Sequence, residues 1–173
     1  RFYIRKSNQH EVPAQKLIKA NPKFMEQSFW PDGMVRVSGR EFNGMMESAC
    51  YQRGELSCIS CHDLHKSAND SRSYKQWAND LMKEEMVTNQ ACFQCHTSLI
   101  PNVKKHTHHS EHSSGSQCIN CHMPYSTYGL LKAIRSHQIS NPTVAESTDS
   151  GRPNACNQCH LDKTLNWAAT YLE

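Results

Sequence analysis

The sequence is short of the residues that usually build a protein interior. Its 173 residues are 37% hydrophobic, and aromatic residues make up only 8%, whereas typical globular domains are roughly 45–50% apolar. A chain this polar either stays largely disordered or folds around something other than protein. Nine cysteines and eleven histidines, both far above ordinary usage, argue against disorder. We therefore expect a domain of ordinary size whose interior is partly supplied by a bound group.

The sequence also lacks long hydrophobic runs and any stripe of basic residues. No run approaches the roughly 18 apolar residues that a membrane-spanning helix needs, so we predict no transmembrane segment in this chain. The formal net charge is only +3, and Lys and Arg are scattered, which predicts no nucleic-acid partner. No signal peptide is recognisable, and the chain starts at Arg1 rather than Met. We therefore expect it to be part of a longer, processed chain.

The local patterns predict a fold that is mostly α with long loops and little sheet. The clearest amphipathic pattern predicts a helix over residues 71–87, and the last residues, 161–173, predict a second helix. Weaker patterns predict a short helix at 14–20 and a strand over 35–42. Residues 128–134 are expected to form one or two helical turns.

Polar composition predicts loops at 101–117 and 140–153. We expect residues 1–173 to form a single domain. Within it, residues 1–50 would be a lightly structured N-terminal arm, and residues 51–173 would form the region that binds the cofactor.

The pattern Cys-x-x-Cys-His occurs four times and carries most of the chemistry. In chain order, motifs 1 to 4 are Cys58, Cys61 and His62; Cys92, Cys95 and His96; Cys118, Cys121 and His122; and Cys156, Cys159 and His160. Two thiols one helical turn apart can each add to a vinyl group on one edge of a porphyrin, and the following imidazole then binds the iron. The motifs therefore predict four covalently attached haem c groups around which the chain is wrapped.

Paired cysteines have two other common uses in proteins. Cys-x-x-Cys pairs also bind zinc or act as redox dithiols, but neither use requires a histidine directly after the second cysteine. Disulfides within such pairs would cross-link almost nothing. The ninth cysteine, Cys50, lies outside the motifs. It is read as a reduced, partly buried small residue, or alternatively as a thiol that forms an intermolecular bridge.

Each motif histidine is a candidate proximal iron ligand: His62, His96, His122 and His160. The histidines outside the motifs exceed the number of iron positions left to fill, which favours two histidine ligands per iron and low reduction potentials. The candidate distal ligands are His65, His137, His109, His108 and His10; His106 and His112 belong to the same His-rich run. Methionine is a weaker candidate, because Met82 and Met86 fit the apolar face of a helix.

Two stretches resemble a known family. The run CINCHMPYSTYGLLKAIRSHQISNP, followed by NACNQCHLDKTLNWAA, resembles the haem-binding part of multihaem cytochromes c, which are often fused to tetratricopeptide or HEAT-like repeats. This likeness covers about residues 30–173. A more distant similarity, over about residues 105–160, is to the last two haem segments of pentahaem cytochrome c nitrite reductases and their octahaem hydroxylamine-oxidising relatives.

The resemblance implies roles for particular residues. It implies that His137 and one histidine of the HTHH run are distal ligands, and that the block from Asp32 to His65 leads into a haem and supplies a ligand to its neighbour. The nitrite reductases carry their catalytic haem on a Cys-x-x-Cys-Lys motif, and this sequence has none.

Motifs and resemblance together imply an electron carrier rather than an enzyme. We expect single electrons to pass between closely spaced haems and redox protein partners, including copies of this chain, other multihaem cytochromes or a membrane-associated complex. The alternatives are a subunit of a polymeric haem wire or larger redox complex and, more weakly, a reductase of nitrite or hydroxylamine type. Because haem c is attached outside the cytoplasm, a periplasmic or extracellular, cell-surface location is expected.

Overall fold

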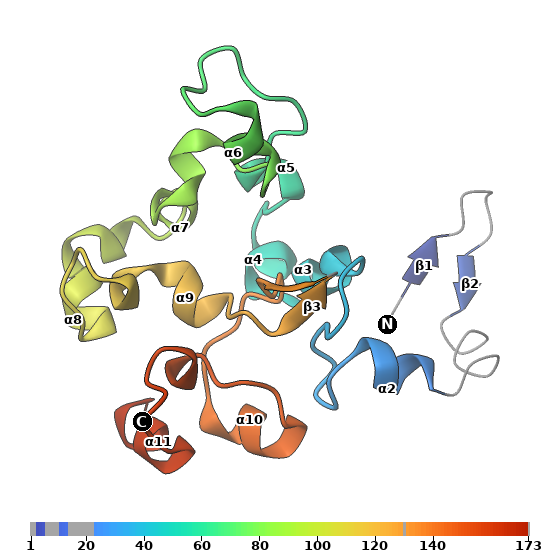
Figure 1. The fold of residues 1–173 in the computed structure, drawn as a ribbon, viewed down its shortest axis with the longest axis vertical. Coiled ribbons are helices and arrows are strands. Elements are labelled where there is room, and N and C mark those ends of the chain that lie inside the picture. Colours follow the sequence, from blue (N-terminus) through green and yellow to red (C-terminus); the bar gives the residue numbers. More distant parts are fainter. Residues whose placement is uncertain (1–2, 6–10, 14–22, 130, 173) are drawn as a thin grey trace. The chain divides into compact units, whose positions relative to one another are not determined.

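The computed structural model describes residues 3–5, 11–13, 23–129 and 131–172, and Figure 1 shows their helices and strands. The candidate ligand His10 and the helix predicted at 14–20 lie outside the described residues. The chain forms two compact units. The first unit combines the chain up to Gln52 with the chain from Cys121 onward, and the second unit is the intervening segment from Arg53 to Asn120. The predicted single domain with an arm at 1–50 stays a prediction.

Short helices dominate both units. In the first unit the elements are β1 (Tyr3–Arg5), β2 (Glu11–Pro13), α2 (Phe24–Ser28), α3 (Glu41–Glu47), α4 (Ala49–Arg53), β3 (Thr127–Gly129), β4 (Lys132–Ile134), α10 (Val144–Ser150), the 3-10 helix η4 (Cys156–Gln158) and α11 (Leu165–Leu172). In the second unit they are α5 (Cys58–Cys61), α6 (Tyr74–Ala78), η1 (Glu84–Val87), α7 (Gln90–Phe93), η2 (Thr97–Asn102), α8 (Val103–Thr107) and η3 (Ser114–Ser116). Helix α9 (Cys118–His122) spans the boundary. The predicted mostly helical fold with little sheet is confirmed.

The described residues contain two small antiparallel sheets of two strands each. Strand β1 pairs with β2, with Ile4 opposite Val12. Strand β3 pairs with β4, with Tyr128 opposite Ala133. The prediction of helical turns over 128–134 was therefore wrong. Leu131 lies in the turn of this hairpin with a φ of 64°, a left-handed conformation that a regular helix cannot contain.

The first unit has a small protein core beside β3. Phe29 and Val35 form a β-bridge, and Val37 forms another with Tyr128. The Thr127 hydroxyl donates to the Val35 carbonyl at 2.9 Å, and Met34 is only 1% exposed. These contacts pack residues 29–37 against β3. The strand predicted over 35–42 is reduced to these bridges, because the chain turns into α3 at Glu41.

A buried arginine links two distant parts of the first unit. The Arg152 guanidinium donates through Nε to Asp32 at 2.6 Å and through Nη2 to Glu146 of α10, and its side chain is 4% exposed. Helix α10 ends at Gly151 with a φ of 73°, the left-handed conformation that favours glycine after a helix. Arg152 thereby ties the end of α10 to the turn at Asp32.

The remaining element predictions were partly wrong. The helix predicted over 71–87 is reduced to α6 and η1, because Leu81 adopts a left-handed φ of 55° and the chain there pairs with motif 1. The predicted loops at 101–117 and 140–153 contain α8, η3 and α10. The C-terminal helix is confirmed as α11. Within the described ranges, none of the helices is long and apolar enough to span a membrane.

Candidate functional site

Each of the four motifs contains a helical turn. In motifs 1, 2 and 4 the histidine N–H donates to the carbonyl of the first cysteine, four residues back, at 2.9, 3.0 and 2.9 Å respectively. Motif 3 lies entirely within α9. A bond of this kind closes one turn of α-helix. Every motif therefore holds its two thiols one helical turn apart, as attachment to one porphyrin edge requires.

Side-chain caps start these turns. The amide N–H of Cys118 donates to Asn89 Oδ1 at 2.8 Å, and that of Cys156 donates to Asn154 Oδ1 at 2.9 Å. In motif 1 the N–H of Ser57, just before the helix, donates to the Ser60 hydroxyl at 3.1 Å. Polar side chains at such positions satisfy N–H groups that a short helix leaves unpaired. The turns are thus set by the residues around the cysteines.

Two motif histidines have the tautomer that an iron ligand needs. His62 Nδ1 lies 3.0 Å from the Asp80 carbonyl, and His122 Nδ1 lies 2.9 Å from the Ser140 carbonyl. Because a carbonyl only accepts, Nδ1 carries the proton in each contact, and the lone pair is on Nε2. Contacts of this kind orient ligating imidazoles and increase their basicity.

The contact of His62 is built by a strained turn. Leu81 has a φ of 55°, which costs a non-glycine residue about 1–2 kcal/mol. Around it, the Asp63 N–H donates to the Leu81 carbonyl at 2.8 Å, and the Lys83 N–H donates to the Cys61 carbonyl at 2.9 Å. These bonds hold the Asp80 carbonyl against the imidazole of motif 1.

The other two motif histidines have different surroundings. The His160 ring packs on Trp167 of α11, with 4.8 Å between ring centroids. His96 follows α7 and is exposed. All four motifs are therefore at least partly open to solvent, with exposed cysteines at positions 58, 95 and 159.

His109 and His137 share a local geometry. His109 Nδ1 contacts the Thr107 carbonyl at 2.5 Å, and His137 Nδ1 contacts the Arg135 carbonyl at 3.2 Å. Both imidazoles therefore carry the lone pair on Nε2, as His62 and His122 do.

Each of these histidine segments also lies against a glycine. A methyl group added at Gly115 would lie 2.2 Å from the His109 ring. One added at Gly44 of α3 would lie 2.9 Å from the backbone nitrogen of Gln138, the residue after His137. Glycine is needed where another group approaches the backbone this closely. Gly44 and Gly115 thus leave room for the His137 and His109 segments.

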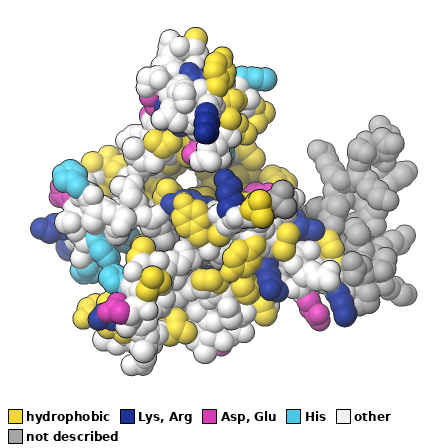
Figure 2. All heavy atoms as spheres, viewed as in Figure 1, with side chains coloured by type: hydrophobic (Ala, Val, Ile, Leu, Met, Phe, Trp, Pro, Cys, Tyr) yellow, Lys and Arg dark blue, Asp and Glu magenta, His cyan; other side chains and the backbone are white. Residues whose placement is uncertain are grey.

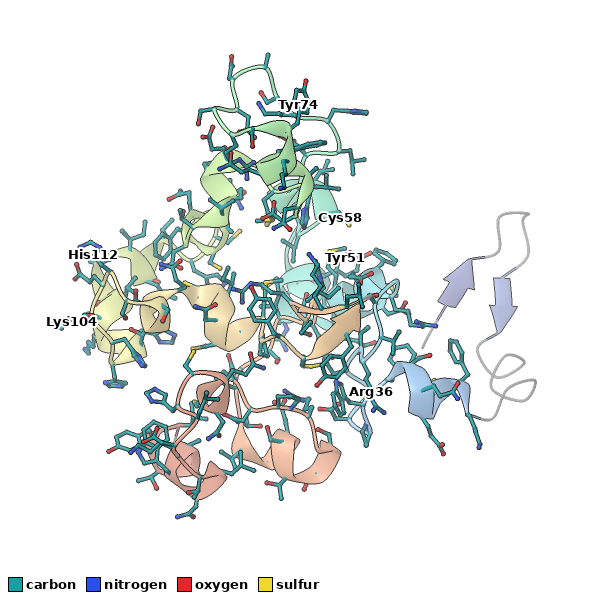
Figure 3. All side chains as sticks on the ribbon, in the orientation of Figure 1. Arg36, Tyr51, Cys58, Tyr74, Lys104 and His112 are labelled. Carbon is teal, nitrogen blue, oxygen red and sulfur yellow. The ribbon has the colours of Figure 1, made fainter. Side chains whose placement is uncertain are left out.

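The remaining candidate histidines within the described residues are exposed. His65 lies in a bend after α5, and His108 caps the C-terminal end of α8 with a left-handed φ of 57°. His106 and His112 are exposed in the same segment, and Figure 3 shows His112 beside α8. None of the roles predicted for these side chains is tested by their positions.

The scarcity of buried apolar residues fits a large apolar cofactor. Six hydrophobic residues are buried among those described, whereas many large ones are exposed beside the motifs. Ile59 inside motif 1 is 65% exposed, Leu64 just after it is 69% exposed, and Leu161 after motif 4 is 84% exposed. Hydrophobic side chains are visible over much of the surface in Figure 2. Such exposed apolar surface usually marks a binding site, and a porphyrin face would cover it.

Side-chain amides link the segments around successive motifs. In the second unit, Gln94 of motif 2 donates to the Ser60 carbonyl of motif 1 at 3.5 Å, and Asn89 donates to the Ser116 carbonyl at 2.8 Å while it caps Cys118. In the first unit, Gln158 of motif 4 accepts from the Tyr125 N–H at 3.1 Å and donates to its carbonyl at 3.2 Å. These contacts keep consecutive attachment points close together.

None of the nine cysteines forms a disulfide. Burial raises the pKa values of the Cys61 and Cys156 thiols. A hydrogen bond with Cys92 lowers the pKa of Cys118 to about 7, so the first cysteines of motifs 2 and 3 lie side by side. Cys50 is half-buried in α4. In the described part of the chain, no three His, Cys, Asp or Glu side chains form a group that could hold one metal ion.

The site therefore has the features of a cytochrome c. Residues 104–169, which include motifs 3 and 4, the HTHH run and His137, match the model of the cytochrome c552 family. This match confirms the resemblance to a cytochrome c family related to haem segments of the nitrite reductase type. The family carries covalently bound haem c and is typically exported. No curated protein and no solved structure matches the chain.

Sequence reasoning missed several residues that shape the site. The carbonyls of Asp80 and Ser140 have no sequence signal, because every residue has a carbonyl. The pattern around Trp167 predicts a helix and indicates no contact with His160. Gly44 and Gly115 had no specific signal either, because glycine also occurs in turns and loops without any close contact.

Proposed function

We propose that this chain is a tetrahaem c-type cytochrome that transfers single electrons to redox protein partners. The observation that supports it best is the closed helical turn found in all four motifs. The match over residues 104–169 supports haem at motifs 3 and 4. The same turn in motifs 1 and 2 extends the proposal to the rest of the chain.

Each bound haem would supply a one-electron iron couple whose potential depends on its ligands and surroundings. The chain's own residues would hold and tune this group. The cysteine pairs would anchor it, and Nε2 of His62, His96, His122 and His160 would face the iron. The Asp80 and Ser140 carbonyls would make His62 and His122 stronger donors.

His109 and His137 are our first proposals for distal ligands. Both imidazoles have the required tautomer, and both lie in the segment matched to cytochrome c552. His65, His108 and His10 remain further candidates. Two imidazoles per iron would leave no open position for a substrate, which favours electron transfer over catalysis.

The test is a haem count on paired cysteine variants. The unaltered protein should carry four haems per chain by alkaline pyridine assay and by mass. Cys58→Ala with Cys61→Ala, and the matching pair in each other motif, should each lower the count by one. Cys50→Ala is the control and should leave the count at four. If the count stays at four in one of these variants, haem is not attached at the motif that the variant alters.

A nitrite or hydroxylamine reductase is the second candidate, because the family matched over residues 104–169 is related to nitrite reductases. That activity needs an iron with an open sixth position. Low-spin spectra from every haem that do not change on adding nitrite would support the electron carrier. A high-spin ferric signal that shifts with nitrite would support the reductase.

The partners and location follow from the carrier role. We propose redox proteins as partners, including copies of this chain or other multihaem cytochromes, in the periplasm or at the cell surface. A subunit of a polymeric haem wire or of a membrane-associated redox complex is the alternative. Filaments in negative-stain images of purified protein would favour the wire.

A further inference from the structure

The histidine of motif 4 lies at one end of an aromatic stack. The centroids of the His160 and Trp167 rings are 4.8 Å apart with planes inclined at 50°, and those of Trp167 and Tyr171 are 4.9 Å apart at 42°. Trp167 is half-buried, and Tyr171 is 69% exposed. The stack therefore runs from the motif to solvent.

The stack is fixed by the way α11 is anchored. Trp167 and Tyr171 are four residues apart, so they lie on the same face of α11. Ala168, next to Trp167, is fully buried. Between the motif and α11, the Lys163 N–H donates to the His160 carbonyl at 3.1 Å, and Asn157 of motif 4 donates to the Lys163 carbonyl at 2.7 Å. The indole thus has a defined position relative to the imidazole.

This contact differs in kind from those of motifs 1 and 3. The carbonyls of Asp80 and Ser140 contact His62 and His122 at a ring nitrogen, in the direction of the N–H. Trp167 packs against the ring of His160 instead. Packing of this kind resists rotation of the imidazole and keeps water away from it.

We propose that Trp167 is a positioning residue that fixes the plane of the His160 imidazole, and that Tyr171 supports Trp167 from the solvent side. The inference rests on the proposed function, since it assumes a haem at motif 4. With haem bound, the imidazole plane sets the electronic anisotropy of the low-spin iron. Exclusion of water from the ligand favours the ferrous state, which carries less charge.

The test compares Trp167→Leu with Trp167→Phe in the haem-loaded protein. Both variants should keep four haems per chain. Trp167→Leu should shift the low-spin electron paramagnetic resonance feature of one haem and lower one of the four midpoint potentials, because leucine leaves room for water. Trp167→Phe keeps a ring against His160 and should restore both signals. Tyr171→Leu should shift the same feature by a smaller amount.

Trp77→Leu is the matched control. Trp77 is also half-buried, and it packs against a tyrosine of its own helix, Tyr74, with 6.5 Å between the ring centroids. This variant should leave the haem at motif 4 unchanged.

Two outcomes would contradict the positioning role. In the first, Trp167→Leu gives the same signals as the unaltered protein; in the second, Trp167→Phe shifts the signals as far as Trp167→Leu does. If Trp167→Leu fails to assemble, Tyr171→Leu decides: a shift confined to the haem at motif 4 supports the role, and an unchanged signal overturns it. Fewer than four haems in the unaltered protein would instead contradict the proposed function.

Discussion

The two units differ in what their interiors are made of. Every buried hydrophobic residue among those described belongs to the first unit: Phe29, Met34, Val35, Met45, Ala155 and Ala168. In residues 53–120, all of which the structure describes, Ser116 alone is buried. Yet this second unit contains motifs 1 and 2 and the first cysteine of motif 3. Under the proposed function, the second unit would leave most of its core to covalently bound haem, whereas the first unit has apolar protein packing of its own.

Polar contacts hold the second unit in place of an apolar core. Arg72 binds Asp70 through two hydrogen bonds and also donates to the Met82 carbonyl. Ser71 donates to Glu84 through both its N–H and its hydroxyl. Solvent screens such surface contacts, so each adds little to stability. The second unit should therefore depend on haem for its stability more than the first unit does.

The largest expected effect is the loss of structure in the second unit when one of its haems is removed. Cys92→Ala with Cys95→Ala should remove one haem and raise amide hydrogen exchange throughout residues 53–120 to near the unfolded rate. Cys156→Ala with Cys159→Ala should raise exchange near motif 4, while residues 29–37 stay protected by their own packing. Exchange measured by mass spectrometry checks both. Equal loss of protection in the two units would contradict the comparison.

A medium effect is expected from the protein core. Met34 is 1% exposed and accepts a hydrogen bond from the buried Ser126 hydroxyl at 3.2 Å. Met34→Ala should lower the free energy of unfolding of the first unit by about 2–5 kcal/mol, because it leaves a cavity. Met86→Ala in the half-buried η1 is the control and should cost about 1 kcal/mol or less. Denaturant unfolding followed by Trp30 fluorescence measures the difference.

The smallest expected effect is a change in the stability of the second unit with pH. A hydrogen bond from Arg72 lowers the pKa of Asp70 to about 2. Because the pKa in the folded state is the lower one, this pair should stabilise the unit fully above about pH 4, and the effect should be lost as pH falls through 2. Side-chain nuclear magnetic resonance of Asp70 should follow this titration. Arg72→Gln should return the pKa of Asp70 towards its usual value, and an unchanged pKa would contradict the assignment.

The sequence predicted the chemistry of the site better than its framework. The spacing of Cys58, Cys61 and His62 predicts one helical turn, and the same turn is present in every motif. The periodic pattern over 71–87 did not predict the break at Leu81, because hydrogen bonds between that segment and motif 1 outweigh local helix propensity. The chosen distal ligands His109 and His137 stay predictions. Pattern alone gave no sign of the carbonyls that orient His62 and His122.

The ion pair of Arg152 with Asp32 has a consequence for the order of assembly. These residues are 120 positions apart, and the whole second unit lies between them in the chain. A ribosome or translocon that delivers the chain from its N-terminus releases motifs 1 and 2 well before Arg152 emerges. The ion pair of the first unit cannot form until then, so under the proposed function haem would be attached to motifs 1 and 2 on a chain whose own hydrophobic core is still incomplete.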